Sequence, residues 1–154
     1  MDVNERRSLI QEQVKAVLVG INADPNQISA DLLDEVNSLV ESPTDFLGTF
    51  ESEYLILPAE VLISVMKKHQ RYFPVFDTNK NLLNHFIGVR NGNNQHLDIV
   101  ADGNAQVIRA RFADARFFIH EDMKRKLGDY REMLSTLTFQ FKLGSLLDMT
   151  NRFE

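Results

Sequence analysis

Two short β-like runs in the middle of the chain constrain the fold more than any other feature. Tyr72 to Phe76 and Leu82 to Val89 are rich in aromatic and β-branched residues, and the polar loop 77–81 joins them. Such a pair of runs predicts an antiparallel hairpin. Because the segments on both sides carry apolar residues at helical spacing, we expect an α+β protein in which helices pack around a small antiparallel sheet.

Three helices are expected before the hairpin. The apolar residues of 4–19 recur at steps of three and four residues, which is typical of a helix. Ser29 is a candidate N-cap of a second helix, which must end before Pro43 because the residue before a proline avoids helical backbone. A third helix is expected to begin at Pro58. The aromatic stretch 46–50 is either a strand or an extended linker.

The part of the chain after the hairpin is expected to be helical. The run Asp102-Gly103-Asn104 predicts a break or cap between a short helix and a long one. Phe112 belongs to the apolar stripe of the long helix, and the adjacent Phe117 and Phe118 are also assigned mainly to the core. A further helix is expected over 129–143, ending at Gly144. Its inward residues would be Leu134, Leu137 and Phe141.

Composition and motifs exclude several classes of function. The absence of cysteine from the 154 residues rules out a disulfide scaffold, a thiolate metal site and a cysteine nucleophile. Phosphate-binding glycine loops, serine-hydrolase motifs and zinc-protease motifs are also missing. The one local cluster of potential ligands, His120-Glu121-Asp122, would point its side chains in different directions on a helix. We therefore expect no catalytic residue, no cofactor site and no metal site.

The sequence also predicts the cellular location of the chain. No run approaches the roughly 18 apolar residues that cross a bilayer. The start, MDVNERRSL, is charged from its second residue and lacks the apolar core of a secretory signal. We expect a cytoplasmic location and no membrane partner.

Charge is distributed unequally along the chain. Residues 1–60 carry 12 acidic and 3 basic side chains, whereas residues 61–154 carry 14 basic and 10 acidic ones. Such an asymmetry can mark a side that faces nucleic acid. Basic residues interleaved with aromatic ones can bind phosphates and stack on unpaired bases. An ordinary solvated surface over an aromatic core explains the same pattern, so both interpretations remain open.

Four strings, by their order and spacing, carry more information than any short motif. They are LPAEVLISVMKKHQRYFPVFD at 57–77, LLNHFIGVRNG at 82–92, DGNAQVIRARFADARFFIHED at 102–122 and FQFKLGSLLDMTNRFE at 139–154. With these strings the chain resembles the β subunit of the bacterial heterotetrameric glycyl-tRNA synthetase. The resemblance extends back through LLDEVNSLVESPTDFLGTFESEYL at 32–55.

The resemblance implies an activity and a set of partners. Enzymes of this family join glycine to its tRNA with ATP, and their α and β chains form a heterotetramer. The α chain carries the aminoacylation site, so ATP and magnesium would bind there and not to this chain. The implied partners are the α subunit, the remainder of a longer β subunit and the glycine-specific tRNA, tRNA(Gly).

The resemblance also implies a domain organisation. Residues 1–154 would form a single α+β domain, with an N-terminal helix and loop over 1–28 and the start of a following helical region over 129–154. The chain is further similar to an α+β domain of the B3/B4 type from another synthetase. It departs from the family pattern at Phe112, Arg116 and Met149, which makes Arg116 a poor candidate for a shared role.

Three roles remain open at this point. The leading hypothesis is a domain that is inactive alone, docks subunits and positions tRNA through phosphate contacts. A second is a pure protein-interaction module, in which Phe46, Phe50 and Tyr54 form an exposed patch. A third is editing of mischarged tRNA, which rests on fold analogy alone. The residues expected to contact phosphates are Lys67, Lys68, Arg71, Arg90, Arg109 and Arg111.

Overall fold

The chain consists of helices and two small antiparallel sheets, which confirms the predicted α+β class. A computed structural model describes residues 2–153, and these form two compact units. The first unit ends at Arg116 and the second begins at Phe117. The single domain predicted for 1–154 stays a prediction, since compact units need not be independent domains. Within residues 2–153, no helix is both long and apolar enough to cross a membrane.

A three-stranded sheet forms the centre of the first unit. Its strands are β1 (Pro43–Thr49), β2 (Phe73–Phe76) and β3 (Leu82–Asn91), in the order β1-β3-β2. All neighbouring strands are antiparallel. The pairing of β2 with β3 confirms the predicted hairpin, and the segment that was expected to be a strand or a linker proves to be the edge strand β1.

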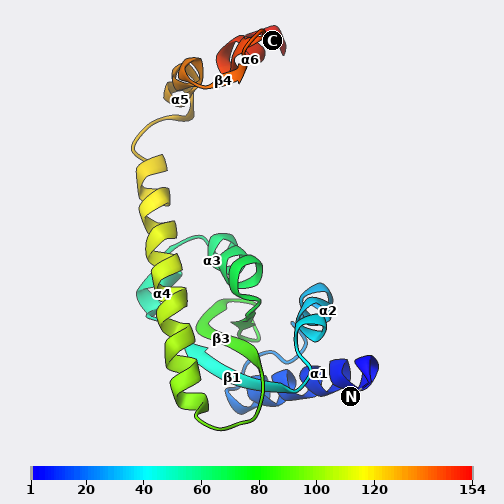
Figure 1. Cartoon of the computed structure of the whole chain (residues 1–154). Helices are drawn as coiled ribbons and strands as arrows, with labels where there is room; N and C mark the ends of the chain where they lie inside the picture. The colour runs from blue at the N-terminus through cyan, green and yellow to red at the C-terminus, as the bar shows by residue number, and fades with distance from the viewer. Residues whose placement is uncertain (1, 154) are drawn as a thin grey trace. The chain divides into compact units, whose positions relative to one another are not determined.

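Two N-terminal helices cover one face of the sheet, as Figure 1 shows. Helix α1 (Val3–Gly20) begins where the Asp2 carboxylate accepts hydrogen bonds from the N–H groups of Asn4 and Glu5. Helix α2 (Ala30–Leu39) ends before Pro43, as expected. Between these helices and the sheet lies a tightly packed aliphatic core. Its main members are Ile10, Val14, Leu18, Leu32, Leu33, Val36, Phe73, Val75 and Ile87.

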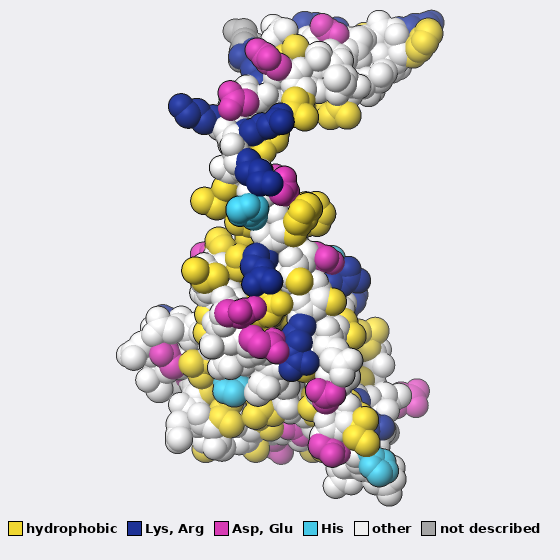
Figure 2. All heavy atoms as spheres, turned by 90° about the vertical axis from the view of Figure 1, so that its left-hand side faces the viewer, with side chains coloured by type: hydrophobic (Ala, Val, Ile, Leu, Met, Phe, Trp, Pro, Cys, Tyr) yellow, Lys and Arg dark blue, Asp and Glu magenta, His cyan; other side chains and the backbone are white. Residues whose placement is uncertain are grey.

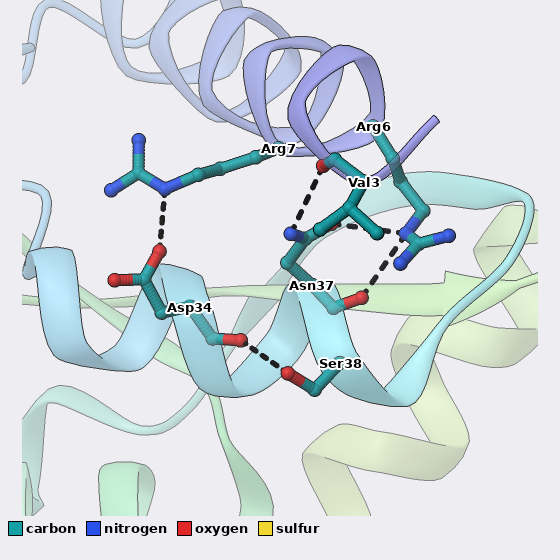
Figure 3. Close-up of polar contacts among 6 residues, drawn as sticks. All are labelled: Val3, Arg6, Arg7, Asp34, Asn37 and Ser38. Atoms are coloured by element: carbon teal, nitrogen blue, oxygen red, sulfur yellow. Dashed lines mark hydrogen bonds and ion pairs between the residues drawn. The ribbon is translucent and has the colours of Figure 1, made fainter. Parts of the chain in front are cut away.

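A buried amide fixes the packing of α1 against α2. The Asn37 side chain is only 4% exposed. Its Nδ2 donates to the Val3 carbonyl at 3.2 Å, and its Oδ1 accepts from Arg6 Nε at 3.0 Å (Figure 3). Because a buried polar group without a partner is costly, these bonds select one register of the two helices. Nearby, the Arg7 guanidinium pairs with Asp34 on the surface.

Aromatic side chains form a second core on the other face of the sheet. This face is covered by the turn η1 (Ser52–Ile56), by helix α3 (Ala59–Val65) with its continuation η2 (Met66–Gln70), and by α4 (Leu97–Asp122). The rings of Tyr72 and Phe86 stack with centroids 4.5 Å apart, and Phe50 meets Phe112 edge to face at 4.9 Å. Contacts of this kind add to the stabilisation from apolar burial alone.

Two glycines make room for this aromatic core. Gly48 of β1 lies opposite Phe86, and Gly88 of β3 lies opposite Phe46. A Cβ atom at either glycine would stand within about 2.2 Å of the facing ring. The exposed patch predicted for Phe46, Phe50 and Tyr54 is therefore wrong. All three are buried. Gly88 leaves room for the Phe46 ring, and Phe50 and Tyr54 pack against Phe112 of α4, contacts between distant segments that helical spacing could not reveal.

Helix α4 runs without interruption from Leu97 to Asp122. The break predicted at Asp102-Gly103-Asn104 is wrong. Asn104 turns inward and accepts a hydrogen bond from the Tyr72 hydroxyl, while its Nδ2 donates to the Val100 carbonyl at 2.7 Å. The side-chain amide of Asn104 is therefore bonded within the helix and does not cap a helix end. Phe112 is fully buried, as predicted.

The second unit differs from its predicted structure. Instead of a helix over 129–143, the chain forms α5 (Leu127–Met133), a short turn η3 (Leu134–Thr136), and a pair of short strands, β4 (Thr138–Gln140) and β5 (Gly144–Ser145). Helix α6 (Leu146–Phe153) follows. The prediction failed because Leu137, Phe139 and Phe141 alternate with polar residues, a period of two that favours a strand.

Candidate functional site

The predicted phosphate-contacting residues all lie in the first unit but on several separate elements. Lys67 and Lys68 belong to η2, and Arg71 follows directly in left-handed backbone with φ of 55°. Arg90 lies near the end of β3. Arg109 and Arg111 lie on α4, where two residues of separation put them on opposite faces. The structure therefore brings Lys67, Lys68 and Arg71 together and leaves the others apart.

Two of these six cations form ion pairs with carboxylates. Arg71 Nε lies 2.8 Å from Glu35 Oε1 of α2, and Arg109 Nε lies 2.7 Å from Glu51 Oε1 beside η1. Such exposed pairs are weak individually. They nevertheless lower the local positive potential that a phosphate would meet.

Arg116 makes a contact of the same kind further along α4. Its Nη1 lies 3.2 Å from Glu53 Oε1, and its guanidinium lies over the Tyr54 ring at 5.2 Å from the centroid. Because Arg109 and Arg116 are seven residues apart, they share one face of α4. Together they attach that face to the segment 51–54.

Ion pairs within the fold connect the acidic and the basic halves of the sequence. The acids Glu35, Glu51 and Glu53 come from the acidic first 60 residues, and each pairs with an arginine from the basic remainder of the chain. Three of the twelve acidic side chains of residues 1–60 are therefore paired with the basic half of the sequence within the fold. These pairs account for part of the charge asymmetry without a nucleic-acid surface.

Arg90 forms a hydrogen bond with the loop that follows β3. It is half-buried, and its Nη1 donates to the Gln95 carbonyl at 3.1 Å. This bond ties the end of β3 to the loop that leads into α4. A guanidinium used in this way has fewer donors left for a phosphate.

Four of the six predicted cations have no carboxylate within 4.0 Å in the part of the chain that the structure describes. They are Arg90, whose printed contact is the Gln95 carbonyl, and Lys67, Lys68 and Arg111. Lys67 and Lys68 line a shallow hollow of about 250 Å³ together with Asp31 and Glu35. The two carboxylates make this hollow mixed in charge. On the side of the first unit that Figure 2 shows, dark blue and magenta side chains are interspersed and form no continuous basic surface.

Partial burial shifts the pKa of three titratable groups. Burial raises the pKa of Tyr72 to about 12 and lowers the pKa of His85. Burial also raises the pKa of Asp45, and its own backbone N–H, which donates to the carboxylate, offsets part of this effect. Residues 2–153 contain no group of three or more histidine, aspartate or glutamate side chains placed to hold a metal ion. The expected absence of cofactors stays a prediction.

Exposed apolar side chains are the feature of the second unit that sequence reasoning missed. No side chain of 117–153 is buried, and Phe141 is 97% exposed. The core positions predicted for Phe117 and Phe118 are wrong, since both are more than half exposed. The period-two pattern at 137–141 could have revealed part of this surface. The large exposed residues are Phe117, Phe118, Met123, Leu127, Met133, Leu137, Phe139, Phe141, Leu143 and Phe153.

Comparisons with known proteins agree with one another. A family model described as glycyl-tRNA synthetase beta subunit matches residues 1–154. The glycine–tRNA ligase beta subunit of Bacillus subtilis (strain 168) is 48% identical over 151 residues, which are 98% of this chain and 22% of that protein. The corresponding subunit of Clostridioides difficile (strain 630) is 47% identical over 154 residues, which are 100% of this chain and 22% of that protein.

A third relative gives the same result. The glycine–tRNA ligase beta subunit of Lactiplantibacillus plantarum is 45% identical over 151 residues, again 98% of this chain and 22% of that protein. The chain therefore spans about a fifth of the length of the curated relatives that it matches.

Proposed function

Because the chain belongs to the glycyl-tRNA synthetase beta subunit family, we propose that it is a non-catalytic docking part of an enzyme that charges tRNA with glycine. ATP and magnesium would be bound by the α subunit, where the chemistry would take place. This chain would contribute contact surfaces to the α subunit or to the remainder of a β subunit. On its own it would be inactive.

The observation that carries this proposal is the uncovered apolar surface of residues 117–153. Each large apolar side chain gains about 1.5–3 kcal/mol when it is fully buried, and this unit leaves ten of them substantially exposed. Exposed apolar surface of this extent is typical of sites that another protein segment covers. We therefore name the exposed side chains of residues 117–153 the docking surface.

The experiment compares two neighbouring substitutions in the docking surface. Phe141→Ser removes a ring that is 97% exposed, so the fold should not depend on it. Lys142→Ser is the matched control on the adjacent exposed residue. Each variant of the chain is titrated by calorimetry with a ligase α subunit, and separately with the part of a β subunit that lies outside the match.

We expect Phe141→Ser to weaken at least one of these associations about tenfold, as an apolar contact residue at an interface does. Lys142→Ser should leave both associations unchanged. Equal affinity of the two variants for both partners, or no association of the parent chain with either one, would overturn the docking role.

Positioning of tRNA is the second candidate, favoured by the unpaired charges of Lys67, Lys68 and Arg111. Phosphate binding by these cations would make the affinity for tRNA steeply dependent on salt, and removing one such cation should lower the slope of log K against log salt by roughly 0.7–0.9. We expect Lys68→Glu and Arg111→Glu to reduce this slope for tRNA, while Lys15→Glu on the exposed face of α1 does not. Identical slopes for all three variants would contradict a tRNA role for these cations.

A further inference from the structure

Strand β1 leaves one edge of the sheet open. In the order β1-β3-β2, β1 has β3 on one side and, among residues 2–153, no strand on the other. The outer edge of a sheet presents unpaired N–H and C=O groups, which another extended chain can pair with. The register of β1 against β3 determines which peptide groups this edge exposes.

The register identifies the outward groups. Phe50 N–H donates to the Asn84 carbonyl at 3.1 Å, and Gly92 N–H donates to the Ser42 carbonyl at 2.8 Å. In an antiparallel pair, the bonded positions alternate, so the even-numbered residues of 42–50 face β3. The backbone groups of Asp45, Leu47 and Thr49 therefore point away from the sheet.

The two ends of this edge differ in how many of their outward backbone groups already have a partner within the chain. Pro43 has no N–H to offer, and its carbonyl accepts from Gln13 Nε2 at 3.3 Å. The Asp45 N–H interacts with its own carboxylate closely enough to lower the pKa of that carboxyl, and this interaction competes with an incoming strand. In contrast, the outward groups of Leu47 and the N–H of Thr49 find no hydrogen-bond partner among the described residues. The open part of the edge is thus its second half.

A groove runs along this open part. Two adjoining hollows of about 390 and 170 Å³ share Leu47 and Ala101 in their linings. Val17 of α1 contributes to one wall, and Leu97, Asp98 and Ala101 of α4 contribute to the opposite one. We call this feature, defined by Asp45, Leu47 and Thr49 with these wall residues, the edge groove.

The edge groove is acidic. Asp45 and Asp98 line the larger hollow and Asp102 lines the smaller one. None of the three has a cation within 4.0 Å among residues 2–153, and Asp102 accepts only from Gln106 Nε2 at 2.9 Å. Arg109, the basic residue in the lining, is already paired with Glu51. A phosphate backbone would be repelled here, whereas lysine or arginine side chains would find partners.

We propose that the edge groove binds an extended polypeptide segment with basic side chains, which pairs with β1 as a fourth strand. Main-chain hydrogen bonds to Leu47 and Thr49 would supply affinity, and the three aspartates would select lysine or arginine at alternate positions. The site lies in the first unit and involves none of the docking surface. Its test needs no enzyme subunit, so its failure leaves the proposed docking role intact.

The experiment titrates the ¹⁵N-labelled chain with an eight-residue peptide of alternating valine and lysine, followed by NMR. We expect shifts centred on the amides of Leu47, Thr49 and Asp98. The same peptide is then N-methylated on one or the other set of alternate residues. Only one set of N–H groups can face β1. Methylation of that set should weaken binding about tenfold, because it removes hydrogen bonds to β1. Methylation of the other set, whose N–H groups point away from β1, should not.

Charge is tested with matched variants on one helix. Asp98→Lys should weaken binding of the lysine peptide several-fold, whereas Asp114→Lys, an exposed carboxylate further along α4, should not. A peptide with glutamate in place of lysine should bind much more weakly. Equal binding of both charge types, equal effects of the two methylation patterns, or shifts induced at these amides by tRNA but not by the peptide would each overturn the proposal.

Discussion

At the scale of single residues, the glycines under the aromatic core are the positions where one added carbon atom matters most. A Cβ at position 48 would stand 2.1 Å from the Phe86 ring, which is fully buried and stacked on Tyr72. We expect Gly48→Ala to lower the free energy of unfolding by about 1–3 kcal/mol, because the ring has no space to retreat. Urea denaturation measures this loss.

A glycine in the opposite situation provides the control. Gly103 lies inside α4, and no atom stands within 4 Å of the Cβ that an alanine would add. Gly103→Ala should raise the free energy of unfolding by up to about 1 kcal/mol, since alanine favours helix. A stabilising effect at both positions would show that the Phe86 ring is free to move.

Asp45 links stability to pH through its burial. Burial raises the pKa of this carboxyl in the folded chain above its value in the unfolded chain. Ionisation of Asp45 therefore opposes folding. The free energy of unfolding falls as pH rises from the unfolded-state pKa to the folded-state pKa. We expect Asp45→Asn to stabilise the chain at pH 7 by less than about 1 kcal/mol, since the group is partly solvated. The gain should vanish below about pH 3.5. Urea denaturation of both proteins across pH 3–7 tests this, and a gain that persists at low pH would contradict it.

At the scale of elements, the ion pairs along α4 attach the helix to the segment that precedes α3. Arg109 pairs with Glu51 at 2.7 Å. We expect Arg109→Glu and Glu51→Arg each to destabilise the chain, and the double swap to recover about 0.5–1 kcal/mol. Thermal unfolding of the four proteins in the cycle measures this coupling.

The same cycle separates stability from RNA binding. If Arg109 acted only on phosphates, the double swap would restore no stability and tRNA affinity would fall with Arg109→Glu alone. Additive effects of the two single changes on stability would show that the pair contributes nothing to the packing of α4.

Local sequence signals predicted those elements whose structure depends on near neighbours. The hairpin of β2 and β3, the helices α1 and α2, and the buried position of Phe112 follow from periodicity and turn residues. Helix prediction over 129–143 failed because Leu137 and Phe141 fit both a helical and a strand period. The unbroken α4 depends on a hydrogen bond from Tyr72, 32 residues away from Asn104 in sequence, which no local pattern reveals.

The candidate site was harder to predict for a related reason. The sequence shows which residues are cationic, but their partners are distant, as Glu35 is from Arg71 and Glu51 from Arg109. Only the fold shows that these charges are paired. Lys67 and Lys68, which are adjacent in sequence and lack such partners, remain as the basic cluster that the sequence could identify.

At the scale of the whole molecule, the two units should differ greatly in local stability. The free energy of local unfolding, which controls amide hydrogen exchange, rises with the number of buried apolar contacts. The first unit contains two cores that include fully buried Ile10, Val14, Phe86 and Phe112, whereas no side chain of 117–153 is buried. We expect slow amide hydrogen exchange over β3 and the central part of α4, and fast exchange throughout 123–153.

Hydrogen exchange followed by mass spectrometry gives both regions in one experiment, so each serves as the control for the other. Exchange over 123–153 should slow at least tenfold when a partner covers the docking surface, because burial of its side chains raises the opening free energy. Protection over β3 should change little in the same mixture, since that strand lies in a formed core. Slow exchange over 123–153 in the isolated chain would show that this unit is stable without a partner, and the main argument for a docking role would then fail.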